Sequence, residues 1–216
     1  MSESVDLNKL GKLFVSAFPE MDIDEQKLSL TLYRLLAKGA PVSREQLAKV
    51  TGQSLENINH TLGGWPDIFY DDDDCVIGFL GLTSQEMPHR LEVNGHTVYT
   101  WCAWDTLFIP ELLGATAHVT STCPVTQKEI KLIVSPAGIK AVNADEVWVS
   151  FVSPDENELR ENVTTSFCHF VYFFADRTVA ERWIKEHPGT FLLSLDDAFA
   201  VGKQVNAARY MQTLNQ

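Results

Sequence analysis

The most reactive side chains of this chain fall in two short segments, Cys102-Ala103-Trp104-Asp105 and Ser166-Phe167-Cys168-His169-Phe170, whose cysteines are 66 residues apart. A helix over the first segment would place the Cys102 thiol and the Asp105 carboxyl on one face, because residues three apart are neighbours on a helix surface. The Cys168 thiol would add a second sulfur beside this proton donor. Such a set suits a soft metal and a proton-transfer reaction.

Each of these residues also has a plainer interpretation. Free cysteine is often a small buried hydrophobe, so Cys102 can be a core residue and Asp105 a capping or surface acid. Cys168 lies in an aromatic segment predicted to be a strand, Phe167–Phe174, where a core cysteine also fits. A regular strand would turn His169 to the opposite face, exposed or satisfied by a neighbour. Spacing alone favours these structural roles.

A helix is predicted over residues 101–113, followed by Gly114 as its C-terminal stop. Pro110 would kink this helix or restart it. Cys102 would lie near the helix start, where free N–H groups and the positive end of the helix dipole favour a thiolate.

The other two cysteines carry weaker signals. Cys123 precedes Pro124 at a predicted strand end, which indicates a structural role. Cys75 follows four consecutive aspartates, 71–74, and no role is assigned to it. Consecutive carboxylates cannot all reach one calcium ion, and the spaced ligands of an EF-hand are missing, so a solvated turn is expected.

Several enzyme classes lack their motifs. No Cys-x-x-Cys pair is present to make a zinc knuckle or a redox motif. The chain has no glycine-rich phosphate loop and no dinucleotide fingerprint. Nothing local marks His96, His118 or His187 as the base of a cysteine protease.

Composition limits the partners and the location. The formal net charge of −12, from 17 basic and 29 acidic side chains, argues against nucleic acid or an anionic membrane as the main partner. No apolar run reaches membrane-spanning length, and the N-terminus shows no signal-peptide pattern. We therefore expect a globular cytoplasmic protein whose four cysteines are free thiols.

The first part of the chain predicts a winged-helix-like domain, residues 1–85. Apolar periodicity or capping residues indicate three helices, and two short apolar runs flank the aspartate turn as a hairpin. The predicted helices cover residues 23–37, 43–52 and 54–64, and the strands cover 68–70 and 76–79.

This domain is not expected to bind DNA. Its third helix would present Glu56, Asn57, Asn59 and His60 but no lysine or arginine, and its wing tip would be four aspartates. Residues 1–90 hold 8 basic and 14 acidic side chains, the reverse of a phosphate-binding surface. A structural or lid role is the better interpretation.

The second part, residues 86–216, predicts an α+β domain with a mostly antiparallel sheet and flanking helices. An Asn94-Gly95 turn joins two strands within residues 91–99. Beyond the helix at 101–113, further strands are predicted at 116–123, 129–135, 147–152 and 167–174, and helices at 178–187 and 194–211.

Taken together, these segments resemble the alkylmercury lyase family, the organomercurial-cleaving enzymes of bacterial mercury resistance. The likeness follows the family's order and spacing over roughly residues 20–211. It runs through Gly81-Leu82-Thr83, Tyr99–Leu107, Thr116–Val119 with Cys123, Val134–Pro136, Ser166–Cys168, Phe173–Ala175 and Ala198–Phe199-Ala200.

The resemblance implies protonolysis of a carbon–mercury bond to a hydrocarbon and Hg(II), with Cys102 and Cys168 as mercury-binding thiolates and Asp105 as the proton carrier. No cofactor is implied, because mercury is substrate and product. Small thiols and mercuric reductase would accept the Hg(II), with neither nucleic acid nor a membrane as partner. The chain departs from several relatives in carrying His169 where they have a second cysteine, which could alter the hand-off of mercury.

Adjacency adds a pocket hypothesis to this implied chemistry. Trp101, Trp104 and Phe167 flank the predicted site residues. Their apolar surfaces could receive alkyl or aryl groups and keep Asp105 protonated, since a carboxyl in an apolar pocket has a raised pKa.

Two other functions compete with the lyase. A thiol-based mercury sensor would need a basic recognition helix, which the sequence lacks. A soft-metal carrier without catalysis would need the two thiols but not the acid of Asp105. The sequence leaves open the preference between alkyl and aryl mercurials and the oligomeric state.

Overall fold

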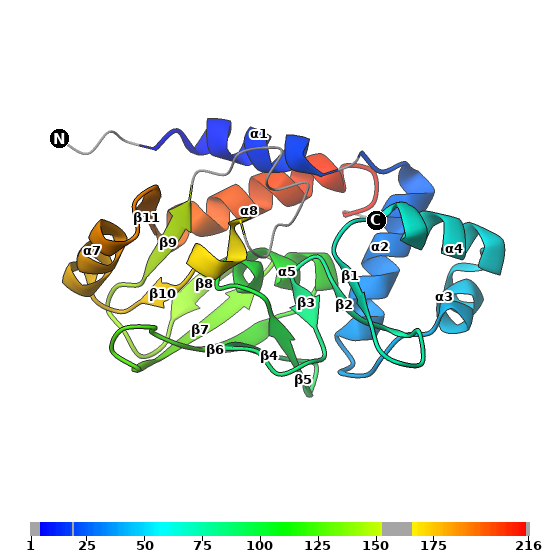
Figure 1. Ribbon diagram of the computed structural model, residues 1–216, viewed down its shortest axis with the longest axis horizontal. Coiled ribbons are helices and arrows are strands. Elements are labelled where there is room, and N and C mark those ends of the chain that lie inside the picture. The colour runs from blue at the N-terminus through cyan, green and yellow to red at the C-terminus, as the bar shows by residue number, and fades with distance from the viewer. Residues whose placement is uncertain (1–4, 19, 153–165, 215–216) are drawn as a thin grey trace.

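An eight-stranded antiparallel sheet runs through the molecule, with helices above it and at both ends of the molecule (Figure 1). The computed structural model describes residues 5–18, 20–152 and 166–214. The strand order is β1-β2-β3-β5-β4-β6-β7-β8, and a second, three-stranded antiparallel sheet has the order β10-β9-β11. The predicted α+β class is confirmed.

The strands of the large sheet are short, and their buried positions alternate in β4 and β6 as expected for a sheet with one covered face. They are β1 (Ile68–Tyr70), β2 (Val76–Phe79), β3 (Leu82–Thr83), β4 (His89–Val93), β5 (His96–Thr100), β6 (Ala117–Thr122), β7 (Glu129–Ser135) and β8 (Gly138–Ala141). The small sheet consists of β9 (Trp148–Val152), β10 (Phe173–Phe174) and β11 (Thr190–Ser194). Sequence patterning missed β3, β8 and β11.

The three helices predicted in the N-terminal part are confirmed as α2 (Ile23–Leu36), α3 (Arg44–Thr51) and α4 (Leu55–Gly64). Their starts follow from capping chemistry, since a side-chain oxygen at the N-cap accepts a free backbone N–H. Asp22 forms a full capping box with Glu25, and Ser43 and Ser54 cap the next two helices. With the β1–β2 hairpin, these helices form the helix-turn-helix-like region.

A further helix, α1 (Leu7–Ala17), was not predicted. Asp6 caps it, and its buried side includes Leu10 and Phe14. It lies along α8 (Leu195–Arg209), above the sheet (Figure 1). The first helix of the chain is therefore part of the cover over the second half.

The β1–β2 hairpin does not stand apart from the rest of the sheet. Strand β3 pairs with β2 on one side and with β5 on the other, so hydrogen bonding continues past residue 85. The division into domains at 1–85 and 86–216 stays a prediction.

Of the two predicted elements around the candidate site residues, the helix begins later than expected and the strand is wrong. The helix expected at residues 101–113 is α5 (Asp105–Leu113), and residues 101–104 form turns before it. The strand expected at 167–174 is a 3₁₀ turn, η1 (Cys168–Phe170), followed by the short β10. The aromatic residues of segment 167–174 pack into the core. The apolar run that this packing requires resembles the pattern of a buried strand.

The remaining helices close the second half. α5 continues through Pro110 and ends at Gly114, whose φ of 64° is the left-handed conformation expected for that stop. α7 (Arg177–Glu186) and α8 match the helices predicted near residues 178–187 and 194–211. None of the helices in the described ranges combines the length and hydropathy that crossing a membrane requires.

Candidate active site

Cys102, Asp105 and Cys168 meet in the interior. One ligand atom from each, the two sulfurs and a carboxylate oxygen, lies within 4.8 Å of the others, and all three residues are buried. The two sequence segments that were 66 residues apart are therefore joined in space. A backbone hydrogen bond of 3.2 Å from Ala103 N–H to the Val171 carbonyl ties the segments together.

Cys102 is held in a tight turn between β5 and α5 rather than in the helix. The Thr100 hydroxyl donates to the Cys102 carbonyl at 2.9 Å, and the Cys102 N–H donates to Asp105 Oδ2 at 2.9 Å. The expected relation on one helical face is corrected: Asp105 is the first helical residue, and its carboxyl reaches back over the turn. The thiol and the acid still lie together, because their ligand atoms are within 4.8 Å of each other.

Cys168 is presented by the 3₁₀ turn η1. The Phe170 and Val171 N–H groups donate back to the Phe167 and Cys168 carbonyls, which closes the turn. The Ser150 hydroxyl in β9 supports the turn: it donates to the Phe170 carbonyl and accepts from the Tyr172 N–H. His169 is exposed, in agreement with the prediction.

Burial controls the protonation of the acid. Asp105 is 6% exposed, and desolvation raises its pKa to about 7, opposed in part by hydrogen bonds with Cys102. At neutral pH a large share of this carboxyl therefore carries a proton. The raised pKa expected for a carboxyl in an apolar pocket is confirmed.

The two thiols are also held in their neutral forms. Burial raises the pKa of Cys102 well above its usual value, and Cys168 and Asp105 raise it further. For Cys168, the hydrogen bond with Cys102 lowers the pKa, but burial and the Asp105 charge outweigh it and the pKa is raised. The expectation that a helix start makes Cys102 a thiolate is therefore wrong, because Cys102 precedes the helix and is fully desolvated.

A small cavity of about 40 Å³ borders the acid and one of the thiols, Asp105 and Cys168. The three aromatic residues of the pocket hypothesis, Trp101, Trp104 and Phe167, all line it. Sequence reasoning missed its other walls: Phe14, Phe18, Tyr33, Leu80, Gly81, Phe108, Leu112, Val205, Asn206, Arg209 and Tyr210. Phe108 and Leu112 belong to α5, the helix of Asp105 itself. The others come from distant segments that only the fold brings together.

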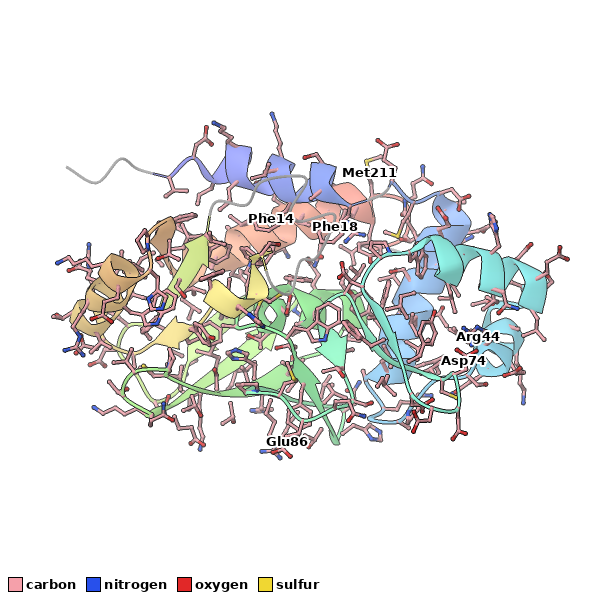
Figure 2. The ribbon with its side chains drawn as sticks, in the orientation of Figure 1. Phe14, Phe18, Arg44, Asp74, Glu86 and Met211 are labelled. Carbon is pink, nitrogen blue, oxygen red and sulfur yellow. The ribbon has the colours of Figure 1, made fainter. Side chains whose placement is uncertain are left out.

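The aromatic wall of the cavity centres on Trp104. Its ring centroid lies 4.6 Å from that of Phe14 and 5.7 Å from that of Phe167, and its Nε1–H donates to the Ala198 carbonyl at 2.9 Å. Figure 2 shows Phe14 below α1, on the side facing the sheet. The unpredicted first helix therefore supplies part of the apolar surface around Asp105.

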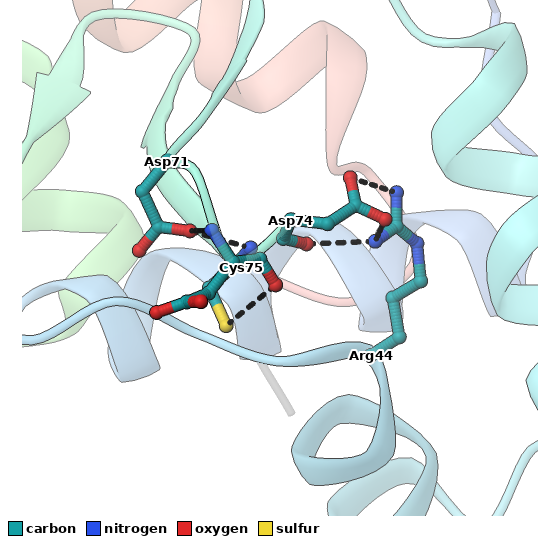
Figure 3. Close-up of polar contacts among 5 residues, drawn as sticks. Arg44, Asp71, Asp74 and Cys75 are labelled. Atoms are coloured by element: carbon teal, nitrogen blue, oxygen red, sulfur yellow. Dashed lines mark hydrogen bonds and ion pairs between the residues drawn. The ribbon is translucent and has the colours of Figure 1, made fainter.

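The remaining candidates lie elsewhere. Cys123 is buried at the end of β6 and stays predicted as structural. Cys75 is partly exposed and donates weakly to the Asp73 carbonyl at 3.8 Å. Figure 3 shows the aspartate turn beside it: Asp71 accepts two backbone N–H groups, and Asp74 pairs with Arg44. Within the described ranges, the buried trio is the only group of three such ligands close enough to hold one ion.

Comparison with known proteins agrees with this arrangement. The sequence profile "Alkylmercury lyase" matches residues 82–206, and the profile "Helix-turn-helix domain of alkylmercury lyase" matches residues 17–80. An alkylmercury lyase of Pseudomonas putida is 43% identical over 81% of this chain and 81% of its own length. One from Staphylococcus epidermidis is 38% identical over 84% of this chain and 82% of its own.

A solved structure has the same fold. The crystal structure of the mercury-bound form of MerB2 aligns with a TM-score of 0.73 and 21% identity, over 94% of this chain and 98% of that one. At this identity the likeness speaks for the fold alone.

The fold and the buried pair of thiols with its acid define a lyase that acts on a carbon–metal bond. The chain belongs to the alkylmercury lyase family, and its Cys102-Asp105-Cys168 group matches the catalytic site of that family. Its reaction is the cleavage of organomercurials.

Proposed function

We propose that Cys102 and Cys168 bind the mercury of the organomercurial and that Asp105 delivers the proton to its carbon. One observation supports this most directly: two sulfurs and a carboxylate oxygen lie within 4.8 Å of one another in a buried site. Thiolates are the preferred ligands of soft metals. A nearby acid with a pKa of about 7 can give up and regain a proton at neutral pH.

The proposed reaction balances without any change of oxidation state. One thiol displaces the exchangeable ligand of the mercurial, and its proton leaves with that ligand. The second thiol binds the same mercury and passes its proton to the Asp105 carboxylate. Asp105 then protonates carbon, the electron pair of the carbon–mercury bond stays with carbon as the new C–H bond, and Hg(II) remains on two sulfurs.

The raised pKa values of the thiols favour this order of events. Cys102 and Cys168 enter as neutral thiols, so their protons are available in the site when mercury binds. A carboxyl that rests near its pKa can receive one of them and release it again. Sulfur's electron density, shared through mercury, makes the carbon a better proton acceptor.

Trp101, Trp104 and Phe167 form the proposed binding surface for the organic group. They line the cavity beside Asp105 and Cys168.

Hg(II) held by two thiolates is exchanged most readily by other thiols. We propose small thiols and mercuric reductase as acceptors, with no nucleic acid or membrane partner and no cofactor. Because the reaction needs two reduced cysteines, the reducing cytoplasm is the proposed location. Residues 1–85 serve a structural role in this proposal, since their net acidic charge disfavours DNA.

The test is cleavage of phenylmercury or methylmercury, measured as benzene or methane released. Cys102→Ala and Cys168→Ala should each lose turnover, whereas Cys75→Ala should keep it as the matched thiol control. Full activity in either site variant would disprove the assignment.

Asp105→Asn separates a lyase from a thiol carrier. The variant should still bind one Hg(II) through two thiols but lose cleavage by roughly 10²-fold or more, the usual contribution of a general acid. Unchanged turnover would remove the proposed role of Asp105. A salt-dependent shift of promoter DNA in a gel would instead support the sensor alternative.

A further inference from the structure

A sharp backbone turn, Leu80–Gly81, borders the Asp105 carboxyl, and it comes from the end of the β1–β2 hairpin. A Cβ at Gly81 would lie 2.7 Å from both Cγ and Oδ1 of Asp105, closer than real Cβ atoms approach other atoms. The absence of a side chain at Gly81 therefore leaves the space that the carboxyl occupies.

The turn has a strained backbone. Gly81 has φ of 96° and Leu80 has φ of 38°, both in the left-handed region. Glycine adopts this region at little cost, whereas a non-glycine residue such as Leu80 does so only where its surroundings hold it. Something must therefore fix the turn in this conformation.

Three hydrogen bonds fix it. The buried Tyr33 hydroxyl, from α2, donates to the Leu80 carbonyl at 2.8 Å, and the Leu80 N–H donates to the Asp67 carbonyl at 3.1 Å. The Trp101 N–H donates to the Gly81 carbonyl at 2.9 Å. Two of these partners belong to the helix-turn-helix-like region, and the third directly precedes Cys102.

We propose that Gly81 is the positioning residue for the proton donor: the turn, held by Tyr33, keeps the Asp105 carboxyl against the Cys102 N–H and next to the two thiols. This inference rests on the proposed role of Asp105 as proton donor. It gives the helix-turn-helix-like region a part in positioning the acid, because α2 and the hairpin hold one wall of the acid's site.

The turn also keeps water from the acid. Leu80 is 9% exposed and lines the same cavity as Asp105, so the turn contributes to the burial that raises the pKa of that carboxyl. The titratable and charged groups around Asp105 and the turn are the thiols of Cys102 and Cys168, the hydroxyls of Tyr33 and Tyr210, the Arg209 guanidinium, and the Asp67 carboxyl, whose pKa burial raises to about 6.

The decisive variant is Gly81→Ala, with Gly189→Ala as its matched control. Gly189 has φ of 91°, close to that of Gly81, but a Cβ there would meet nothing within 4 Å. Both substitutions impose the same kind of backbone strain. Only the change at Gly81 pushes on the acid, so the pair separates displacement of the carboxyl from strain in a turn.

The measurements are Hg(II) binding stoichiometry and single-turnover release of benzene from bound phenylmercury across pH 5 to 9, on the full-length protein. Cleavage should fall as pH rises, because carbon needs the proton that the thiols and Asp105 hold between them. Gly81→Ala should bind Hg(II) normally, cleave roughly tenfold or more slowly, and show its pH midpoint displaced downward. Gly189→Ala should match the parent protein in all three respects.

Folded Gly81→Ala with the rate and pH midpoint of Gly189→Ala would overturn the inference. If Gly81→Ala does not fold, Tyr33→Phe decides, because it removes only the hydroxyl that holds the Leu80 carbonyl. A slower rate with a lowered pH midpoint supports the inference, and an unchanged profile overturns it. Asp105→Asn tests the underlying role separately: if that variant cleaves normally, the proton-donor assignment itself fails.

Discussion

The backbone N–H of Cys102 donates a hydrogen bond of 2.9 Å to the Asp105 carboxyl, so the acid holds in place the turn that carries one of the thiols. The same carboxyl group also borders the backbone of Gly81. Asp105 therefore has two roles. Accepting the Cys102 N–H favours the charged carboxylate, whereas the proposed transfer of a proton to carbon requires the protonated carboxyl.

A first prediction concerns stability against pH. The pKa of Asp105 is raised to about 7 in the folded chain from 3.8. A raised folded-state pKa means that its stabilising contribution is complete below about pH 4 and is lost as pH rises through about 7, roughly 4 kcal/mol in total. Asp105→Asn carries no charge, so it should gain stability relative to the parent at pH 8 and much less at pH 5.

Urea unfolding at the two pH values measures this difference. Asp72→Asn, which changes an exposed acid in the hairpin turn to the same amide, is the control for the substitution itself. An Asp105→Asn variant whose stability relative to the parent is equal at pH 5 and pH 8 would contradict the buried, high-pKa carboxyl.

A second prediction concerns thiol reactivity. Cys75 is partly exposed, whereas Cys102, Cys123 and Cys168 are buried. Because accessibility and thiolate fraction set the alkylation rate, iodoacetamide should modify Cys75 first in the native protein, as followed by peptide mass spectrometry. After one equivalent of Hg(II), Cys102 and Cys168 should be protected even in mild denaturant, and Cys123 should not. Protection of Cys123 in place of Cys168 would argue against the proposed ligand pair.

Local signals predicted much of the fold. Ser43, Ser54 and Gly114 mark helix ends through capping and left-handed backbone chemistry, and each prediction is confirmed. The Asn94-Gly95 turn likewise joins β4 and β5 as expected. These features depend on residues near one another in sequence, which is why the sequence reveals them.

The sequence predicted which residues form the site but not the local backbone structure that carries them. The family pattern pointed to Cys102 and Cys168, yet both lie in turns where a helix and a strand were expected. Long-range packing set these conformations: Ala103 bonds to Val171, and Ser150 supports the 3₁₀ turn. Contacts between residues so far apart in sequence leave no local sequence pattern. Gly81 could not be predicted for the same reason, because its importance depends on the position of Asp105.

A third prediction tests the polar anchor of the aromatic wall. The Trp104 Nε1–H donates to the buried Ala198 carbonyl at 2.9 Å. Trp104→Phe removes this buried hydrogen bond and should cost roughly 0.5–1.5 kcal/mol of unfolding free energy. Trp148→Phe is the control, because its indole donates at 3.1 Å to Glu146 in an exposed setting. Equal losses in the two variants, measured by urea unfolding, would show that the buried bond has no special weight.

A fourth prediction tests whether α1 is part of the active-site wall. Phe14 is 1% exposed, and its ring lies 4.6 Å from that of Trp104 and 4.8 Å from that of Phe167. Phe14→Ala should therefore destabilise the fold by roughly 3–5 kcal/mol, the usual cost of removing a buried phenyl group.

The same change should admit water beside Asp105, lower the pKa of that carboxyl and slow cleavage of bound phenylmercury at pH 8 more than at pH 6. Lys12→Ala, on the exposed side of the same helix, should leave stability and cleavage unaltered. If Phe14→Ala loses stability but keeps the parental rate at both pH values, α1 is a structural cover only. The apolar environment of Asp105 would then depend on Trp104 and Phe167 without help from the first helix.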